Sequence, residues 1–134
     1  MRDTIQPHSS QLTALLPTAD AALLAETLTA FANADGGTLY IGVGEGGAPT
    51  GDFYPEEFGE VVQQAEMLCR PPIPVTWEQV ETGGAFVFVG RVQRSAELHT
   101  LHDGRVLVRA GVENRPATGE QLQQIAASRS TGEY

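Results

Sequence analysis

Residues 28–51, LTAFANADGGTLYIGVGEGGAPTG, constrain the fold of this chain more than any other stretch of it. Apolar residues at helical spacing lead into Asp35-Gly36-Gly37, where a helix ends because glycine adopts the left-handed conformation without steric cost. The alternating apolar residues of TLYIGV at 38–43 predict a strand that begins at once, and the glycine-rich residues 45–51 predict a turn. The segment therefore predicts a helix, a tight stop and a buried strand in immediate succession.

Helix signals frame three segments of the chain. The first helix begins after Pro17, with Thr18 or Asp20 as its N-cap. A second helix begins at Pro55 and ends before the prolines that follow it at 71–74. The pattern Thr118-Gly-Glu-Gln121 is a capping box, which predicts a third helix near the C-terminal end.

Strand patterns fill the region between the second and third helices, over 75–81, 85–93 and 99–110. Gly83-Gly84 and Asp103-Gly104 occupy positions typical of tight hairpin turns. We therefore expect an α+β fold: a two-layer sandwich of a mixed or antiparallel sheet of about five strands with about three helices packed on one face. Residues 1–134 fit a single domain, with 1–17 as an arm or a strand and 129–134 as a frayed tail.

The composition excludes several classes of protein. No apolar run approaches the ~20 residues of a membrane-spanning helix, so we expect no membrane partner. The first ten residues, MRDTIQPHSS, lack the apolar core of a signal peptide. The single cysteine, Cys69, excludes an intrachain disulfide and fits a reducing compartment. These features predict a cytoplasmic protein.

The chain is acidic overall, and its charged residues are unevenly distributed along the sequence. A net charge of −9 argues against strong nucleic-acid binding, but residues 91–115 hold five arginines against three acids. Arginine suits forked contacts with phosphate. The candidate nucleic-acid contacts are therefore Arg91, Arg94, Arg105, Arg109 and Arg115.

Two interpretations of these arginines stay open. If Arg91 and Arg109 lie on neighbouring strands, they make a shared basic strip, and about two or three phosphate contacts give weak, steeply salt-dependent binding to DNA or RNA. Alternatively, the arginines pair with the many acidic side chains of the surface. Arg109 and Arg115 are the leading candidates for a ligand contact.

The segment Gly42-Val-Gly44-Glu-Gly46-Gly47 matches the Gly-x-Gly-x-x-Gly pattern, in which glycines let the backbone approach a pyrophosphate at the start of a helix. A strand precedes the pattern here, but Ala48-Pro49-Thr50-Gly51 follows it in place of a helix. A hairpin turn is therefore the better interpretation, and we expect no nucleotide cofactor.

Other polar residues have structural interpretations beside the functional ones. Asn33 and Asp35 flank the end of the first helix, where such residues bond to backbone and shape a turn, or serve as polar groups of a pocket. His99 and His102 point to opposite faces if they lie on one strand, so no metal site is expected. Cys69 has no positioned histidine partner and fits packing at a helix end.

Two segments resemble one known family. AFANADGGTLYIGVGEGGAPTG is similar to the central signature of the Schlafen-type, AlbA-like domains, and VQRSAELHTLHDGRVLVRAGVENRPATGEQLQQI is similar to their closing pattern. The resemblance covers roughly residues 20–127 in order and spacing. Within these segments we assign a structural role to Asn33, Gly36, Gly37, Gly42, Gly51 and Gly111.

The resemblance implies a function as well as a fold. Domains of this type are assigned to DNA binding and often stand at the N-terminus of bacterial regulators that carry a helix-turn-helix region, while an older view called them divergent ATPases. In animal Schlafens a related unit cleaves RNA with three carboxylates. A metal-dependent nuclease needs such clustered carboxylates.

This chain departs from the family pattern at the positions that carry chemistry. The stretch IQPHSSQLTALLP has neither the acid nor the Glu-Phe-Lys expected before the first helix, and Gly44-Glu45 replaces Asp-Asp. At most Glu45 remains of a carboxylate set. The leading hypothesis is therefore a non-enzymatic nucleic-acid-binding regulatory module without a metal or cofactor.

Two other functions stay open at this point. The first is a protein-interaction or homo-oligomerisation domain that keeps the fold without the ligand of the family, and the acidic surplus favours it. The second is a metal-dependent nuclease, which ranks last because the carboxylate set is incomplete.

Overall fold

The computed structural model describes residues 9–18, 20–44, 46–50 and 55–130, with side chains as far as residue 127. Helices and short strands make up this part of the chain. In chain order they are β1 (Thr13–Leu16), α1 (Ala21–Asn33), β2 (Gly37–Ile41), α2 (Pro55–Met67), β3 (Cys69–Arg70), β4 (Thr76–Thr82), β5 (Ala85–Val92), β6 (Thr100–Leu101), β7 (Leu107–Ala110), β8 (Glu113–Pro116) and α3 (Gly119–Ser130).

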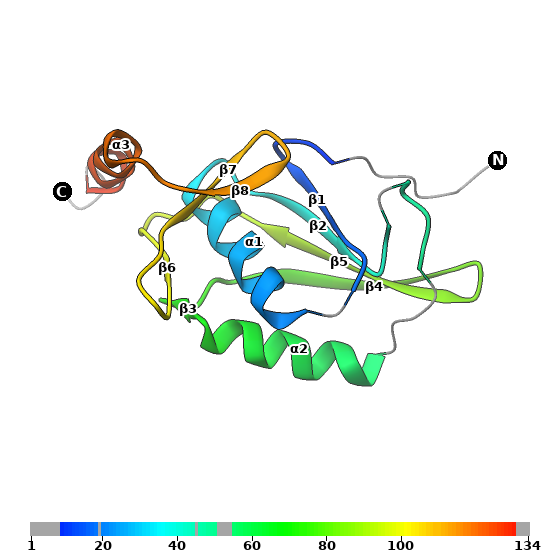
Figure 1. Ribbon diagram of the computed structural model, residues 1–134. Helices are drawn as coiled ribbons and strands as arrows, with labels where there is room; N and C mark the ends of the chain where they lie inside the picture. The colour runs from blue at the N-terminus through cyan, green and yellow to red at the C-terminus, as the bar shows by residue number, and fades with distance from the viewer. Residues whose placement is uncertain (1–8, 19, 45, 51–54, 131–134) are drawn as a thin grey trace.

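The central element is a four-stranded mixed sheet in the order β1-β2-β5-β4. β1 runs parallel to β2, and the other two pairings are antiparallel. The helices α1 and α2 cover one face of this sheet, so that Leu28 and Phe31 of α1 pack in one core with Leu39, Ile41 and Phe88 of the strands (Figure 1). The predicted α+β class, with a mixed sheet and helices, is confirmed.

Helix α1 is enclosed on nearly all sides. Nine of its thirteen residues are buried, whereas a surface helix buries only one apolar stripe. The reason is that the β7–β8 hairpin and α2 pack against opposite sides of α1, which lies between them in front of the sheet (Figure 1). Apolar residues at helical spacing indicate one buried face for this helix, and the structure buries more of it than that face.

The second half of the chain pairs differently from the prediction. Residues 99–110 do not form one hairpin around Asp103-Gly104, because β6 pairs with β3 and β7 pairs with β8. The expected sheet of about five strands is therefore four strands with two separate two-stranded sheets. β8 was missed because its sequence, ENRP, carries no apolar alternation.

The local signals for caps and turns are confirmed. Of the two predicted caps, Asp20 is the N-cap of α1, and its carboxylate accepts a hydrogen bond from Leu23 N at 3.1 Å. At α3, Gln121 N donates to Thr118 Oγ1 at 3.1 Å and Thr118 N donates to Gln121 Oε1 at 2.9 Å, which is a reciprocal capping box. Gly83-Gly84 joins β4 and β5 as predicted.

Helix α3 stands apart from the sheet that α1 and α2 cover (Figure 1). Its Ile125 is buried, but most of its described side chains are exposed. The expected packing of every helix on one face is therefore correct for α1 and α2 and wrong for α3. The helix continues to Ser130, and residues 131–134 of the expected tail at 129–134 lie outside the described part.

Candidate nucleic-acid interface

Asn33 is a buried structural residue that joins the end of α1 to two distant segments. Its side-chain Nδ2 donates to His99 O at 2.9 Å and to Leu107 O at 3.0 Å, and its Oδ1 accepts from His99 N at 2.9 Å. Only 2% of the residue is exposed. The structural interpretation of Asn33 is therefore correct, although its partners are remote in sequence and are not the neighbouring turn.

Close packing explains the two glycines that follow α1. Gly36 has a φ of +79°, and a Cβ there would lie 2.6 Å from Val92 O. A Cβ on Gly37 would lie 2.5 Å from the ring of Phe31. Neither position accepts a side chain without movement of the core. Of the other glycines predicted to be structural, Gly42 and Gly111 lie in turns and Gly51 lies outside the described residues.

The glycine-rich loop after β2 is a hairpin, as expected, and not a phosphate cradle. Gly44 N donates to Ala48 O at 2.9 Å, Thr50 N donates to Gly42 O at 2.8 Å, and Val43 bridges to Pro49. Gly47 N is also used within the loop, in a bond to Gly44 O. Because these amides point inward, they are not available to bind a phosphate.

Arg109, a leading candidate in the sequence, is a buried structural residue and not a surface cation. It is 6% exposed, and its guanidinium donates to Ser10 O, Thr13 O and Asn114 Oδ1 at 2.8–3.3 Å. The same group lies 5.1 Å from the centroid of the Phe31 ring, within the range of a cation–π contact. Burial lowers the pKa of this guanidinium from its ordinary value.

The predicted basic strip of Arg91 and Arg109 is also wrong. Arg91 lies on β5 in the four-stranded sheet, whereas Arg109 lies on β7, which pairs only with β8 among the described strands. We therefore remove Arg109 from the set of nucleic-acid contacts.

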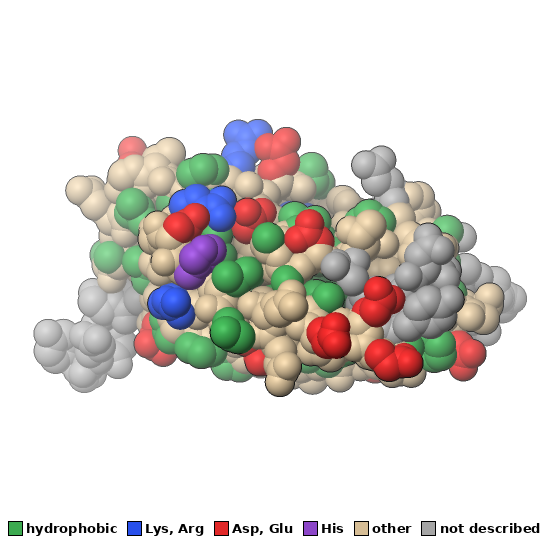
Figure 2. Space-filling model, turned by 60° about the horizontal axis from the view of Figure 1, so that its bottom comes forward, with side chains coloured by type: hydrophobic (Ala, Val, Ile, Leu, Met, Phe, Trp, Pro, Cys, Tyr) green, Lys and Arg blue, Asp and Glu red, His purple; other side chains and the backbone are tan. Residues whose placement is uncertain are grey.

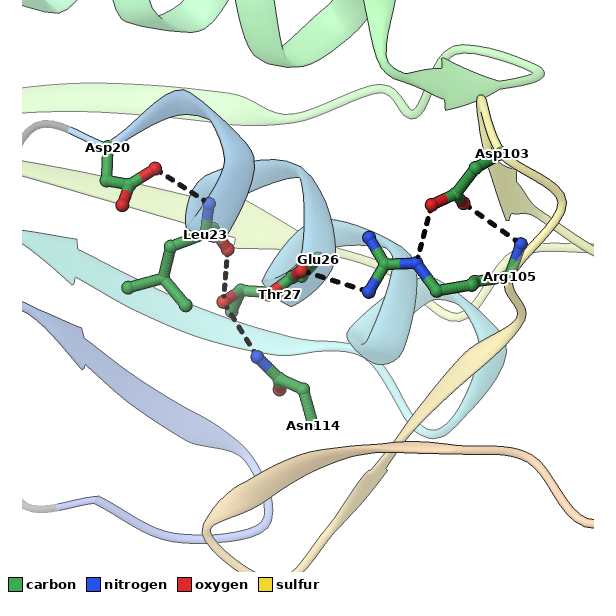
Figure 3. Close-up of polar contacts among 7 residues, drawn as sticks. All are labelled: Asp20, Leu23, Glu26, Thr27, Asp103, Arg105 and Asn114. Atoms are coloured by element: carbon green, nitrogen blue, oxygen red, sulfur yellow. Dashed lines mark hydrogen bonds and ion pairs between the residues drawn. The ribbon is translucent and has the colours of Figure 1, made fainter.

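Arg105 is held by acids on two elements (Figure 3). Its Nε donates to Asp103 Oδ2 at 2.8 Å, and its Nη1 lies 3.2 Å from Glu26 Oε2 on α1. The backbone N–H and the guanidinium of Arg105 hold the pKa of the Asp103 carboxyl below its usual range. Arg115 on β8 is likewise paired, with Glu113 Oε1 at 2.6 Å. Both arginines thus fit the alternative of pairing with surface acids.

Figure 3 also shows how the β7–β8 hairpin is attached to α1. The hydroxyl of Thr27 donates to Leu23 O at 2.8 Å and accepts from Asn114 Nδ2 at 3.0 Å. Because Asn114 also accepts from Arg109, one side chain of β8 joins the helix to the buried guanidinium. These polar contacts satisfy groups that the hairpin covers.

Arg91 lies on the face of the sheet that α1 and α2 leave uncovered. Its neighbour Val92 packs in the core beneath the helices, and alternation along β5 places Arg91 on the opposite side. Residues directly opposite one another in a sheet share a face. The register therefore aligns Arg91 with three threonines across all four strands, and we call this set the Arg91 row: Thr13, Thr38, Arg91 and Thr76.

The Arg91 row ends at a pocket where β4 begins and β5 ends. This strand-end pocket has a volume of about 370 Å³, within the range of small-ligand sites. Arg91 and Arg94 both line it, so the structure brings together these two of the five predicted arginines. The lining residues are Ile73, Pro74, Val75, Thr76, Arg91, Gln93, Arg94 and Ser95.

The ion pair of Arg91 leaves it accessible to a ligand. Its Nη1 lies 3.3 Å from Glu78 Oε1, and both side chains are more than half exposed. Glu78 is a diagonal neighbour, two residues beyond Thr76 on β4. An exposed pair of this kind contributes about 0–1 kcal/mol. A phosphate oxygen can therefore replace the carboxylate at small cost.

Sequence reasoning missed the contact between Ser95 and His99. His99 is 1% exposed, and its Nε2 lies 2.7 Å from Ser95 Oγ while its Nδ1 lies 2.8 Å from Pro71 O. Since the Pro71 carbonyl only accepts, Nδ1 carries the proton, and in the neutral ring Nε2 accepts from the serine hydroxyl. His99 follows Ser95 by four positions in an irregular segment, so no helix or strand periodicity predicts that the two side chains meet.

The acidic residues gather elsewhere on the molecule. Figure 2 shows acidic side chains over the part of one face that α2 forms, with basic side chains toward the opposite end. The acids of α2 are all exposed: Glu56, Glu57, Glu60 and Glu66. The strand-end pocket contains no acid among its lining residues.

Comparison with known proteins shows which family this chain belongs to. A family model described as Schlafen, AlbA_2 matches residues 5–118. The chain belongs to the Schlafen, AlbA_2 family. The match includes both the Arg91 row and the strand-end pocket, and it leaves α3 outside. No curated protein matches the chain in sequence.

Two solved structures share the fold of this Schlafen, AlbA_2 domain. The DIP2311 protein of Corynebacterium diphtheriae is 19% identical with a TM-score of 0.64; the alignment covers 88% of this chain but only 27% of DIP2311. The N-terminal domain of a Nitrosomonas europaea protein, described as related to the ATP-dependent DNA helicase RecG, is 18% identical with a TM-score of 0.59. That alignment covers 89% of this chain and 92% of the other.

Neither a metal cluster nor a membrane-spanning helix is found in the part of the chain that the structure describes. Among those residues, no three or more His, Cys, Asp and Glu side chains are close enough to hold a metal ion. None of the helices described there is long and apolar enough to cross a membrane. Glu45, the one carboxylate that the resemblance leaves for a nuclease, lies outside the described residues.

Proposed function

We propose that this domain is a non-catalytic nucleic-acid-binding module that holds backbone phosphates with Arg91 and Arg94. The observation that carries the proposal is that these two arginines line one pocket beside a row of threonine hydroxyls. Guanidinium groups and hydroxyls are among the side-chain groups that contact phosphates in protein–DNA complexes. The surface lies on the face that α1 and α2 leave uncovered, where the Arg91 side chain is more than half exposed.

Family membership supports the nucleic-acid class of ligand. The Schlafen, AlbA_2 match and a structural neighbour described as related to a DNA helicase point in the same direction, although the neighbour itself shows only a shared fold. As parts of the same proposal, we place the module in the cytoplasm and assign it to regulation. The net charge of −9 limits the strength of binding.

We expect weak binding to single-stranded DNA at low ionic strength, with a dissociation constant on the order of 10–100 µM. With two phosphate contacts, the logarithm of affinity falls with the logarithm of salt concentration with a slope of about −1.4. The double change Arg91→Gln and Arg94→Gln should bring this slope close to zero. Fluorescence anisotropy of a labelled strand across a salt series measures both quantities.

Arg115→Gln is the matched control, because Arg115 is also exposed and paired with one acid but lies on β8. It should keep the slope and affinity of the unchanged protein. If the unchanged protein does not retain DNA or RNA at low ionic strength, or if the double variant binds equally well, the proposal is wrong.

The acidic face of α2 favours a second candidate function, the binding of a protein. Like charges repel, so this face fits a partner rich in lysine or arginine better than it fits a second copy of itself. With oligolysine as the probe, binding should fall by about fivefold when Glu56, Glu57 and Glu60 are changed to Gln. Glu113→Gln on β8 is the control, and an equal fall in that variant would count against a specific face.

A further inference from the structure

We propose that the strand-end pocket binds a nucleotide that carries a phosphate monoester, at the end of a nucleic-acid strand. This inference rests on the proposed function and deepens it, because it distinguishes the pocket from the Arg91 row. The row supplies contacts to phosphates along a strand, whereas the pocket is a half-open recess at the end of that row.

The size and lining of the pocket fit a nucleotide better than a lone phosphate. About 370 Å³ exceeds the space of a single phosphate group and approaches that of a nucleotide. One side of the lining is apolar, with Ile73, Pro74 and Val75. The other side is polar and carries the two guanidiniums. A nucleotide also has an apolar part, the face of its base, and a charged part, its phosphate.

The charge of the lining favours a monoester over a diester. A phosphate monoester carries about −1.5 to −2 charges at neutral pH, whereas a backbone diester carries one. Arg91 and Arg94 supply two positive charges to the lining, and the phosphate replaces the exposed Glu78 carboxylate that otherwise pairs with Arg91. Each guanidinium can bind two phosphate oxygens through its fork. Thr76 and Gln93 add neutral polar groups to the same lining.

A buried anchor fixes the segment that carries Arg94. Ser95 N donates to Ala32 O at 2.9 Å, and the Ser95 side chain contacts the buried His99 at 2.7 Å. His99 is itself held at its backbone by Asn33. His99 is therefore a positioning residue: it holds the rim of the pocket in place before the ligand arrives, which lowers the ordering cost of binding.

Fluorescence anisotropy with three versions of one internally labelled single-stranded DNA tests the proposal: unphosphorylated, 5′-phosphorylated and 3′-phosphorylated. We expect one phosphorylated version to bind about tenfold more tightly than the unphosphorylated strand, since one added charge-assisted phosphate contact has about this effect. In Arg94→Gln this ratio should fall to within about twofold, whereas Arg115→Gln should keep it. Thermal melting verifies that each variant is folded.

The arms of the experiment separate this proposal from the proposed function. If all three strands bind equally in a salt-dependent manner, the pocket proposal is overturned while backbone binding stands. If no strand binds, backbone binding fails, and a nucleoside monophosphate is titrated alone. Saturable binding that Arg94→Gln weakens then supports the pocket as a site for a free nucleotide, and its absence overturns the pocket as well.

Discussion

Asn33→Leu is expected to lower the free energy of unfolding by about 3–5 kcal/mol, which is a large share of the stability of a single domain. The substitution keeps a side chain of similar shape but leaves three buried backbone groups without partners, namely His99 O, His99 N and Leu107 O. Each such group costs about 1–3 kcal/mol when it stays unsatisfied. Urea denaturation followed by circular dichroism measures the loss.

Gln64→Leu provides the control, because it also replaces an amide by leucine but lies at an exposed position of α2. Surface changes of this kind stay within about 0.5 kcal/mol. A loss below about 1 kcal/mol in Asn33→Leu would show that water or a shifted backbone satisfies the three groups instead.

Arg109→Met is expected to cost about 2–4 kcal/mol of stability, because it removes the charged donor of Ser10 O, Thr13 O and Asn114 Oδ1, and only the two carbonyls keep a backbone N–H. It also removes the cation from the Phe31 ring. Arg109→Lys keeps the charge but lacks the planar fork that reaches three acceptors, so it should be destabilising too. Thermal and urea denaturation of both variants measure these effects.

The lysine variant also distinguishes a structural from a ligand-binding arginine. If Arg109 contacted phosphate, lysine would preserve much of the salt-dependent binding, and stability would change little. If Arg109 has the structural role assigned to it, Arg109→Lys should lower the stability of the protein. DNA binding by the folded fraction at low temperature should stay unchanged. Arg115→Met on the exposed surface of β8 is the control and should leave stability within about 0.5 kcal/mol.

The features predicted well from the sequence are those that neighbouring residues determine. The Asp20 cap, the Thr118 capping box and the Gly83-Gly84 turn each depend on a few adjacent positions. The helix stop at Gly36-Gly37 and the strand after it are also correct. The α+β class follows from the order of these local elements.

The features predicted poorly depend on contacts between distant segments. Nothing in the local pattern of α1 reveals that a hairpin formed from 107–116 packs against one of its sides. The prediction placed Arg109 on the surface because arginine is charged. Arg109 follows Leu107 and Val108 on the same strand, and all three residues are buried. Arg91 and Arg94 could be listed as candidates, but their shared pocket appears only once β4 is paired with β5.

The two segments that carry the family resemblance form one packed unit in the structure. Phe31 lies between Gly37 and the Arg109 guanidinium, and Asn33 joins the same helix end to His99 and Leu107. The signature residues are therefore explained by packing and by buried hydrogen bonds. Of the two candidate ligand contacts, Arg94 lies near the start of the second segment and Arg91 directly precedes that segment on β5.

The enclosure of α1 has a consequence for how the protein is made. Chains are synthesised from the N-terminus, and a segment whose partners come late must wait for them. Among the described residues, the side of α1 opposite α2 packs against β7 and β8, which end at Pro116. During translation this apolar helix therefore remains open to solvent or to chaperones on one side until nearly the whole domain has left the ribosome.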